Sequence, residues 1–181
     1  ISNLWSQPLA PASGLPAGEP CPLTQGSGRN SRPVFSPDGS WIALDRWMAG
    51  SSRDIWLMRS DGTDLRQLTL DSHAETEGSW MPDGRGLVFL SDREGPWSLW
   101  SVELDSGRER RLAPLPPGVD AVRLSPDGTR LAYQRLGADG SVNLWVSGVD
   151  GREARALTAD PELMGFPSWS PDGRMLAFER K

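Results

Sequence analysis

Several residue types that carry common chemistry are almost missing from this sequence. It has one Cys, Cys21, one His, His73, and one Lys, Lys181. A lone Cys cannot form an intrachain disulfide, and one Cys with one His falls short of the set that a structural zinc site needs. A Ser-His-Asp or Cys-His catalyst would depend on His73 alone, and the Gly-x-Ser-x-Gly elbow is absent. We therefore expect no metal, no cofactor and no catalytic set in this chain.

The charge of the chain argues against two classes of partner. Its formal net charge is −5 and its pI is about 4.9, whereas a surface for nucleic acid or anionic membranes needs clustered cations. The longest apolar runs, such as residues 86–90, are only a few residues long and cannot cross a bilayer. We expect no nucleic-acid partner and no direct insertion into a membrane.

Turn-forming residues and tryptophan are, by contrast, abundant. The 181 residues include 20 Gly and 16 Pro, and there are nine Trp beside four Phe and one Tyr. This share of turn formers is too high for a helical bundle. Because Trp is normally a rare aromatic residue, its surplus indicates large side chains at recurring positions.

Three short signatures recur at a fixed phase along the chain. The first is Pro-Asp-Gly, whose prolines are 45, 44 and 45 residues apart; the second is an apolar residue followed by Trp; the third is Leu followed by Thr or Ala. The end of each third signature lies 13 positions before the next Pro of the first. A period of this length is typical of propellers and solenoids. The members are Pro37, Pro82, Pro126 and Pro171 for the first signature, Trp5, Trp56, Trp100 and Trp145 for the second, and Thr24, Thr69, Ala113 and Thr158 for the third.

Each unit has the pattern of four short antiparallel strands. Pro fixes φ at one turn position and Gly takes the positive-φ position, so Pro-Asp-Gly predicts a hairpin between the first two strands, with its Asp capping the turn. The second strand alternates apolar residues, as at Ile42 and Leu44. The third carries the Trp signature, and a Gly-containing turn leads to the fourth. Four antiparallel strands in about 45 residues predict a blade of a β-propeller, and hence an all-β fold.

The first and last units are incomplete. Residues 1–24 supply only strands three and four, and residues 159–181 supply only strands one and two, with complete blades predicted at 25–69, 70–113 and 114–158. The two half blades complement each other, so the sequence predicts four blade equivalents in a single propeller domain or segment. This phase closes a propeller ring and hides its strand edges. The extra residues from Pro8 to Pro22 predict an enlarged loop.

The units resemble the repeats of the TolB-like β-propeller family. Phe-Leu-Ser-Asp-Arg-Glu-Gly at 89–95, followed by Leu-Trp at 99–100, matches the family pattern in order and spacing, as does Trp-Ser-Pro-Asp-Gly at 169–173. The resemblance covers essentially the whole chain and implies the fold, but it implies little about function, because these residues build turns and blade contacts. Four units are fewer than the six or more blades of such rings. Residues 3–9 and the long loop after them also look like repeats appended to bacterial signalling proteins, such as membrane-tethered regulators and kinases.

Longer loops join strands two and three, and strands four and one, on the propeller face opposite the tight turns. Variable loops on a rigid scaffold commonly carry binding specificity, and Arg and aromatic residues are typical of interface hot spots. The alternative role of these residues is packing between blades or ion pairing. We interpret His73 as a solvated loop residue, and Glu75 and Glu77 as exposed loop acids rather than an acid–base pair. The candidate binding face comprises Arg32, Arg46, Trp47, His73, Glu75, Glu77, Arg93, Trp97, Arg135 and Phe166.

Three functions fit these observations. The first is a non-catalytic module that recognises a protein or small ligand, as the sensor or interaction part of a larger bacterial protein. The second is the gating or substrate-positioning propeller of a serine peptidase, whose triad would lie in a separate domain. The third is an assembly-driven protein, in which two chains exchange half blades and close an eight-bladed ring as a homodimer. The expected location is periplasmic or otherwise extracytoplasmic.

Overall fold

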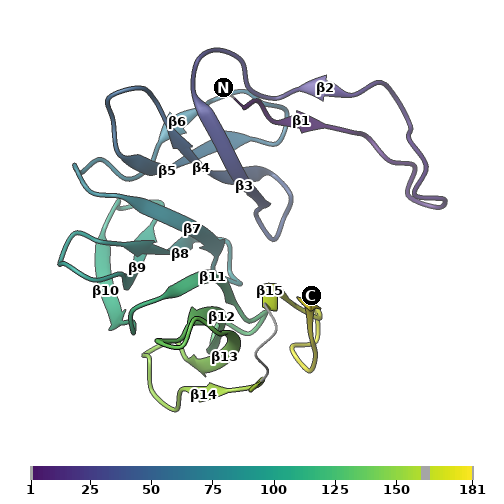
Figure 1. Cartoon of the computed structure of the whole chain (residues 1–181). Coiled ribbons are helices and arrows are strands. Elements are labelled where there is room, and N and C mark those ends of the chain that lie inside the picture. The colour runs from purple at the N-terminus through teal and green to yellow at the C-terminus, as the bar shows by residue number, and fades with distance from the viewer. Residues whose placement is uncertain (1, 160–163, 181) are drawn as a thin grey trace.

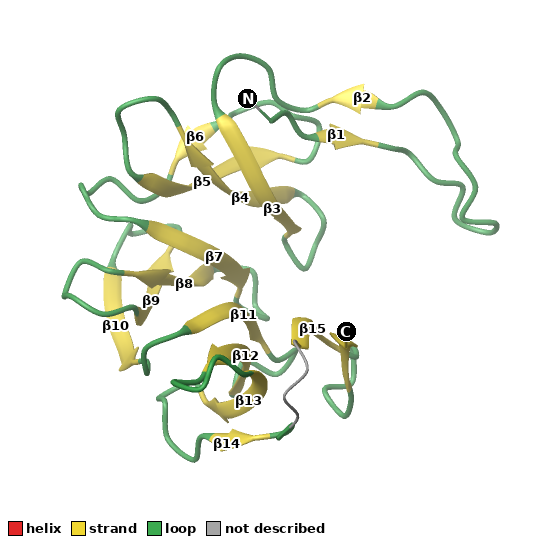
Figure 2. Ribbon diagram, viewed as in Figure 1, coloured by secondary structure: helices red, strands yellow, loops and turns green. Residues whose placement is uncertain are grey.

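The computed structural model describes residues 2–159 and 164–180, and within these ranges the chain forms strands, turns and loops but no helix (Figure 2). Three four-stranded antiparallel sheets are flanked by two two-stranded sheets, and each sheet follows the chain order, as the repeat predicts. The strands are β1 (Trp5–Ser6), β2 (Cys21–Pro22), β3 (Arg29–Phe35), β4 (Trp41–Trp47), β5 (Arg53–Arg59), β6 (Arg66–Gln67), β7 (Glu75–Trp80), β8 (Gly86–Ser91), β9 (Ser98–Glu103), β10 (Glu109–Pro114), β11 (Val119–Leu124), β12 (Arg130–Leu136), β13 (Val142–Gly148), β14 (Arg155–Ala156), β15 (Met164–Trp169) and β16 (Leu176–Arg180).

The Pro-Asp-Gly segments form the hairpins that the sequence predicts, and β3, β7, β11 and β15 all end two residues before the Pro. In the first turn, Asp38 accepts hydrogen bonds from the Ser36 hydroxyl at 2.6 Å and from the Ser40 backbone N–H at 3.1 Å. Gly39 has a φ of 72°, in the left-handed region that Gly adopts without a steric penalty. The hydrogen bonds favour the ionised carboxylate and lower the pKa of Asp38 to about 2. The predicted turn-capping role of the Asp is confirmed.

The sheets follow one another along a curved row, with β3, β7, β11 and β15 on its inner side (Figure 1). The first strand of a sheet packs onto the sheet before it: β7 contacts β4 and β5, and β15 contacts β12 and β13. Apolar clusters fill the boundaries between complete sheets. Tryptophans add a polar contact across two boundaries, because the indole N–H of Trp80 donates to the Val34 carbonyl at 3.0 Å and that of Trp169 donates to the Arg123 carbonyl at 3.1 Å.

Every innermost strand carries a β-bulge that the sequence analysis did not predict. The pairing register shifts between residues 31 and 34, 76 and 79, 120 and 123, and 165 and 168. A non-glycine residue with positive φ lies within each shift. A bulge leaves a residue unpaired in the ladder and redirects nearby side chains. The four residues recur with the period of the Pro-Asp-Gly turns, and they are Arg32 (φ 51°), Glu77 (61°), Ala121 (52°) and Phe166 (28°).

The two half blades do not pair with each other within the chain. β1 pairs with β2, and β15 with β16, in two separate two-stranded sheets. The expected closure by complementary halves is therefore not made by one chain, because the three complete sheets between them do not bring the ends of the row together (Figure 1). The predicted enlarged loop is present at residues 7–20, although Cys21 and Pro22 already belong to β2. Residues 160–163 and 181 of the C-terminal half unit lie outside the described residues.

Candidate functional site

A group of charged residues joins three consecutive sheets along the inner side of the row. Glu77, at the bulge of β7, is fully buried and lies between two arginines. Arg32 Nε of β3 is 2.5 Å from Glu77 Oε1, and Arg123 Nη1 of β11 donates to Glu77 Oε2 at 2.7 Å. One buried carboxylate thus links β3, β7 and β11.

The buried end of this group is Asp45 in β4. The Thr76 hydroxyl donates a hydrogen bond to Asp45 Oδ2, and Arg32 Nη1 lies 3.4 Å from the same oxygen. Asp45 Oδ1 is buried and has no hydrogen-bond partner in the described part of the chain. Burial raises the pKa of Asp45 and of Glu77, because it disfavours the charged form, although the neighbouring donors and arginines oppose the shift.

The other end of the group reaches solvent. Asp120 Oδ1 lies 3.6 Å from Arg32 Nη2, and the Asp120 side chain is exposed while those of Arg32 and Arg123 are partly exposed. Guanidinium and carboxylate groups therefore lie side by side at the surface, where the arginines can pair with a carboxylate or phosphate of a ligand. The set consisting of Arg32, Asp45, Thr76, Glu77, Asp120 and Arg123 is called the inner-wall network below.

A second charged cluster surrounds Arg93. Its guanidinium pairs with Glu109, with Asp71 at 3.0 Å and with Glu75 at 3.4 Å. Glu75 is fully buried and accepts a hydrogen bond from the Ser91 hydroxyl at 2.8 Å. Burial raises the pKa of Glu75 to about 7, and the charge of Asp71 adds to the rise.

The interpretation of Glu75 and Glu77 as exposed loop acids is wrong. Both residues belong to β7, and both carboxylates are buried against arginines. A buried acid persists only where donors or cations offset the loss of its hydration. At Glu77 the cations are Arg32 of β3 and Arg123 of β11. Both are far from Glu77 in the sequence, so the residues around Glu77 do not indicate that it is paired.

Three arginines of the predicted binding face stack on the Trp of the second signature. The contact occurs once in each four-stranded sheet, which indicates a part in blade packing, the alternative role that the sequence analysis left open. A guanidinium over an indole face is an attractive cation–π arrangement. The distances from the guanidinium carbon to the ring centroid are 4.9 Å for Arg46 over Trp56, 4.4 Å for Arg93 over Trp100 and 5.1 Å for Arg135 over Trp145.

The two loop tryptophans of the predicted face also make internal contacts. Trp47 ends β4, where the guanidinium carbons of Arg29 and Arg53 lie 5.9 and 4.8 Å from its ring centroid. Trp97 packs against the apolar cluster between the second and third complete sheets. Both side chains therefore have a role in packing.

The remaining two predicted residues lie apart from these contacts. His73 is exposed, as expected, and its Nδ1 is 3.4 Å from Asp71 Oδ1. Phe166 is exposed at the bulge of β15. The structure thus brings Arg32 and Glu77 together in the inner-wall network and Glu75 and Arg93 in the second cluster, and the ten predicted residues do not form one continuous face.

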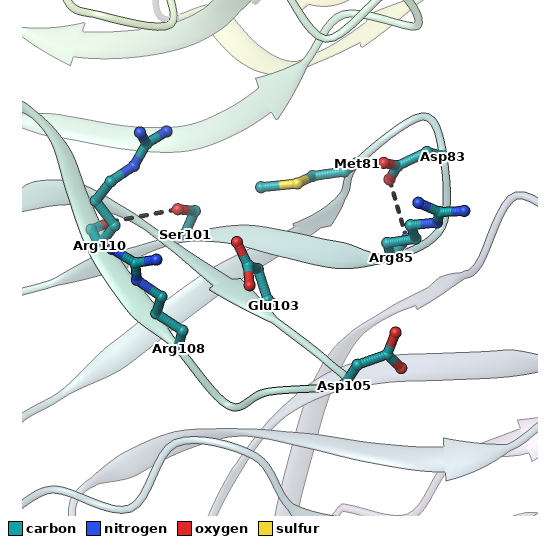
Figure 3. A pocket seen from close by; sticks show the side chains of 8 residues that line it. All are labelled: Met81, Asp83, Arg85, Ser101, Glu103, Asp105, Arg108 and Arg110. Carbon is teal, nitrogen blue, oxygen red and sulfur yellow. Dashed lines mark hydrogen bonds between the residues drawn. The ribbon is translucent and has the colours of Figure 1, made fainter.

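A cavity of about 510 Å³ lies over β9, β10 and the turn before β8 (Figure 3). Arg85, Arg108 and Arg110 line it together with acidic residues that include Glu103. The Ser101 hydroxyl at this site donates to the Arg110 backbone carbonyl at 3.4 Å and has no base beside it. The charged side chains are exposed and opposite charges are balanced, so the cavity offers no organised catalytic group.

Four members of the inner-wall network were missed from the sequence: Asp45, Thr76, Asp120 and Arg123. One signal was available, because the bulge residues lie five positions before each Pro of Pro-Asp-Gly. Arg32 and Glu77 occupy that position, and Thr76 and Asp120 lie directly beside it, whereas Asp45 and Arg123 lie outside it. In residues 2–159 and 164–180, no three His, Cys, Asp or Glu side chains are placed to hold a metal ion. The same ranges contain no helix that could cross a membrane.

Comparison with solved structures finds close matches among TolB proteins. TolB from Acinetobacter baumannii aligns with a TM-score of 0.76 at 26% identity, over 93% of this chain and 41% of that chain. A putative TolB from Agrobacterium tumefaciens aligns with a TM-score of 0.76 at 25% identity, over 99% of this chain and 63% of that chain.

Curated relatives are longer proteins. The uncharacterized peptidase YuxL of Bacillus subtilis is 32% identical over 102 residues, which are 53% of this chain and 16% of that protein. An uncharacterized protein of Agrobacterium fabrum is 31% identical over 124 residues, 62% of this chain and 42% of that protein. The chain therefore spans less than half the length of these two relatives.

A family model described as the TolB beta propeller domain matches residues 15–181. Together with the four-stranded sheets and their period, this match shows that the chain belongs to the TolB beta propeller domain family.

Proposed function

We propose that the chain is a non-catalytic recognition module of a larger protein, and that it binds a protein or small ligand at the inner-wall network. The observation that carries this proposal is the convergence of charged groups from three consecutive sheets on one solvent-open site. Charged side chains that are already fixed by ion pairs lose little further freedom on binding, which lowers the cost of association.

Arg123 is the group best placed to contact a ligand. Its Nη1 donates to Glu77 and to the Val122 carbonyl, both at 2.7 Å, whereas its Nη2 donates no hydrogen bond in the described part of the chain. The side chain is about one third exposed. A guanidinium held in this way can pair with a ligand carboxylate or phosphate while Asp120, exposed nearby, accepts a hydrogen bond from the same ligand.

The absence of an organised nucleophile supports a role without catalysis. His73 contacts Asp71 through its ring, and no Ser, Thr or Cys side chain within residues 2–159 and 164–180 hydrogen-bonds to the imidazole. A Ser or Cys nucleophile needs such a base within hydrogen-bond reach.

Peptide selection on the immobilised chain tests the proposal. A random peptide library displayed on phage supplies the probes, and selected peptides are measured against Arg123→Ala. We expect binding to weaken more than about tenfold, as for loss of an arginine anchor. Arg108→Ala, an exposed Arg in the cavity of Figure 3, is the matched control and retains affinity. Peptides that bind Arg123→Ala and the unchanged chain equally would place the binding site elsewhere.

A second candidate function is the propeller of a serine peptidase, in which the module would admit or position peptides for a separate catalytic domain. The similarity to the uncharacterized peptidase YuxL favours it. The sequence of the full-length gene product discriminates the two candidates: a Gly-x-Ser-x-Gly segment with a downstream Asp and His supports the peptidase, and their absence supports the recognition module.

We further propose an extracytoplasmic location, because TolB-like propeller homologues are typically periplasmic. Fractionation of cells that express the full-length natural protein tests this location, and recovery of the protein with the cytoplasmic fraction would contradict it.

A further inference from the structure

One position of the repeat carries an indole in the first complete sheet and no side chain in the second. Trp41 begins β4 and packs on the apolar cluster between these two sheets. The guanidinium carbons of Arg59 and Arg66 lie 4.0 and 5.1 Å from its ring centroid, so the indole interacts with side chains of both β5 and β6. The counterpart of Trp41 in the second complete sheet is Gly86.

The residues around this position pair in the same register in both sheets. The second sheet keeps one of the two arginines, has an acid in place of the other, and has a Ser in place of a Leu. The corresponding pairs are Trp41–Arg59 with Gly86–Glu103, and Leu57–Arg66 with Ser101–Arg110.

The cavity of about 510 Å³ in Figure 3 lies at this position of the second sheet, because Ser101, Glu103 and Arg110 all line it. Val88, which lies opposite Ser101, belongs to the apolar cluster between the second and third complete sheets. This face of the second sheet is therefore turned towards the third. Both sheets have all four strands, so the cavity is bounded by complete blades.

The chain cannot fill the cavity from Gly86 itself. A Cβ at this residue would lie 2.5 Å from the Val102 carbonyl oxygen and 3.2 Å from Met81 Sδ, and the first distance is far inside van der Waals contact. Met81 replaces the Ser that precedes Pro in the other three turns, and its side chain extends from the turn towards Ser101 (Figure 3). A thioether is a favourable contact for an aromatic ring.

The third complete sheet also uses this position. Its residue there is Arg130, whose guanidinium carbon lies 4.8 Å from the ring centroid of Trp169. Arg130 Nη2 also donates to the Gly173 carbonyl at 2.9 Å. Of the three complete sheets, only the second has a residue without a side chain at this position.

Two charged groups in the cavity have hydrogen-bonding capacity left over. Glu103 Oε2 accepts from the Ser106 hydroxyl at 2.9 Å, whereas Glu103 Oε1 accepts no hydrogen bond in the described part of the chain. The Arg110 guanidinium makes no hydrogen bond or ion pair with any described residue. A ring placed over this guanidinium gains a cation–π contact, and a ring N–H beside Glu103 gains a charge-assisted hydrogen bond.

We propose that this cavity binds the indole side chain of a tryptophan on a partner protein, which takes the place that Trp41 holds in the first sheet. The ring stacks on Arg110 and contacts Met81, and its N–H donates to Glu103. The chain's own indole at the equivalent position favours an aromatic ring, and the acid in place of Arg59 favours a ring that carries an N–H. This site is separate from the inner-wall network, and the two proposals do not depend on each other.

NMR titration of the isotope-labelled chain with N-acetyl-tryptophanamide tests the site. This probe presents an indole between two peptide bonds, as in a protein. We expect shifts of the backbone amides of Gly86, Ser101 and Arg110, and an affinity about two- to fivefold weaker for Arg110→Ala, as for loss of an exposed cation–π contact. Arg66→Ala is the matched control and keeps the affinity, because Trp41 already lies beside Arg66 in the first sheet.

A second probe tests the ring N–H. The derivative that is methylated on the ring nitrogen has no donor to offer to Glu103. We expect the unchanged chain to prefer the N–H probe about fivefold, as for one hydrogen bond, and Glu103→Ala to bind both probes equally. If Glu103 only supported the shape of the cavity, Glu103→Ala would weaken both probes alike and keep the preference.

Three results would overturn the proposal. The first is no shift of the cavity amides up to the solubility limit of the probe. The second is equal affinity of Arg110→Ala and Arg66→Ala, and the third is a preference for the N–H probe that persists in Glu103→Ala. Peptides that bind through this cavity keep their affinity for Arg123→Ala and lose it for Arg110→Ala, so these two variants distinguish the cavity from the inner-wall network.

Discussion

The three complete sheets and the two half blades carry the same signatures, yet they bury them to different degrees. Phe89, in the second complete sheet, is 1% exposed, and Phe178, at the same position of the last unit, is 42% exposed. The sequence motif alone therefore does not create a core position. A residue of one unit is buried by the third strand of its own unit and by the sheet that packs on it, so the smallest packed element spans two units.

The largest expected effect compares these two phenylalanines. We expect Phe89→Ala to lower the free energy of unfolding by about 3–5 kcal/mol, as for a large core truncation. Phe178→Ala should cost about 1 kcal/mol, because much of its surface is already hydrated. Urea unfolding measures both. Equal losses for the two substitutions would show that the half blade is as well packed as the complete sheet.

A second comparison concerns how much two ion pairs contribute to stability, one that joins three sheets and one that lies within a single turn. Glu77→Gln removes the carboxylate that links β3, β7 and β11, and we expect it to destabilise the chain by about 2 kcal/mol. This is below the roughly 3–5 kcal/mol for breaking a fully buried pair, because the two arginines can be rehydrated. Arg152→Ala, in the exposed pair with Asp150, should cost about 0–1 kcal/mol. Identical urea midpoints for Glu77→Gln and Arg152→Ala would mean that the network does not hold the sheets together.

Glu75 provides a test through pH. Burial raises the pKa of Glu75 from 4.5 to about 7, so the folded chain holds a proton that the unfolded chain releases between these values. The stability contributed by this protonated group is fully present below pH 4.5 and is lost as the pH rises towards 7. Glu75→Gln should make the fall in unfolding free energy between pH 5 and pH 7 shallower. An unchanged pH dependence in this variant would show that Glu75 is already ionised in the folded chain.

The smallest effect is expected at the turns. Asp38 accepts hydrogen bonds from Ser36 and from the Ser40 backbone, whereas Asp83 follows Met81 in place of Ser and accepts from the Arg85 backbone N–H. Asp38→Ala should therefore lower the melting temperature by more than Asp83→Ala, as measured by circular dichroism. The reverse order would imply that the Ser before Pro adds nothing to the turn.

Much of the fold could be predicted from local chemistry. Each Pro-Asp-Gly requires a turn, and the strands before the four turns all end two residues before the Pro, at Phe35, Trp80, Leu124 and Trp169. The long loop after β1 follows from the surplus residues of the first unit. These features depend on backbone preferences of a few adjacent residues, so they can be read from the sequence.

The candidate site could be predicted only in part, because its contacts join residues that are far apart in the chain. Arg32 and Glu77 are both predicted site residues, but they lie 45 positions apart, and their pairing depends on bulges in β3 and β7. The fixed distance from each bulge to the next Pro marks where the bulges lie, but it does not show that the two side chains meet. Arg46 and Arg135 were selected as surface cations, whereas each lies over a Trp of the next strand. A lone Arg beside a loop does not reveal whether an aromatic face is within reach.

Hydrogen exchange tests most directly whether the complete sheets and the last half blade differ in packing. β12 pairs with β11 and with β13, whereas its counterpart β16 pairs with β15 alone. Backbone N–H groups in locally open structure exchange faster than those in core strands. In the chain of 181 residues we expect the N–H groups of β16 that face away from β15 to exchange much faster than the N–H groups of β12 that face β13. Equal protection of the two sets would contradict the account that the third strand of a unit is what completes its packing.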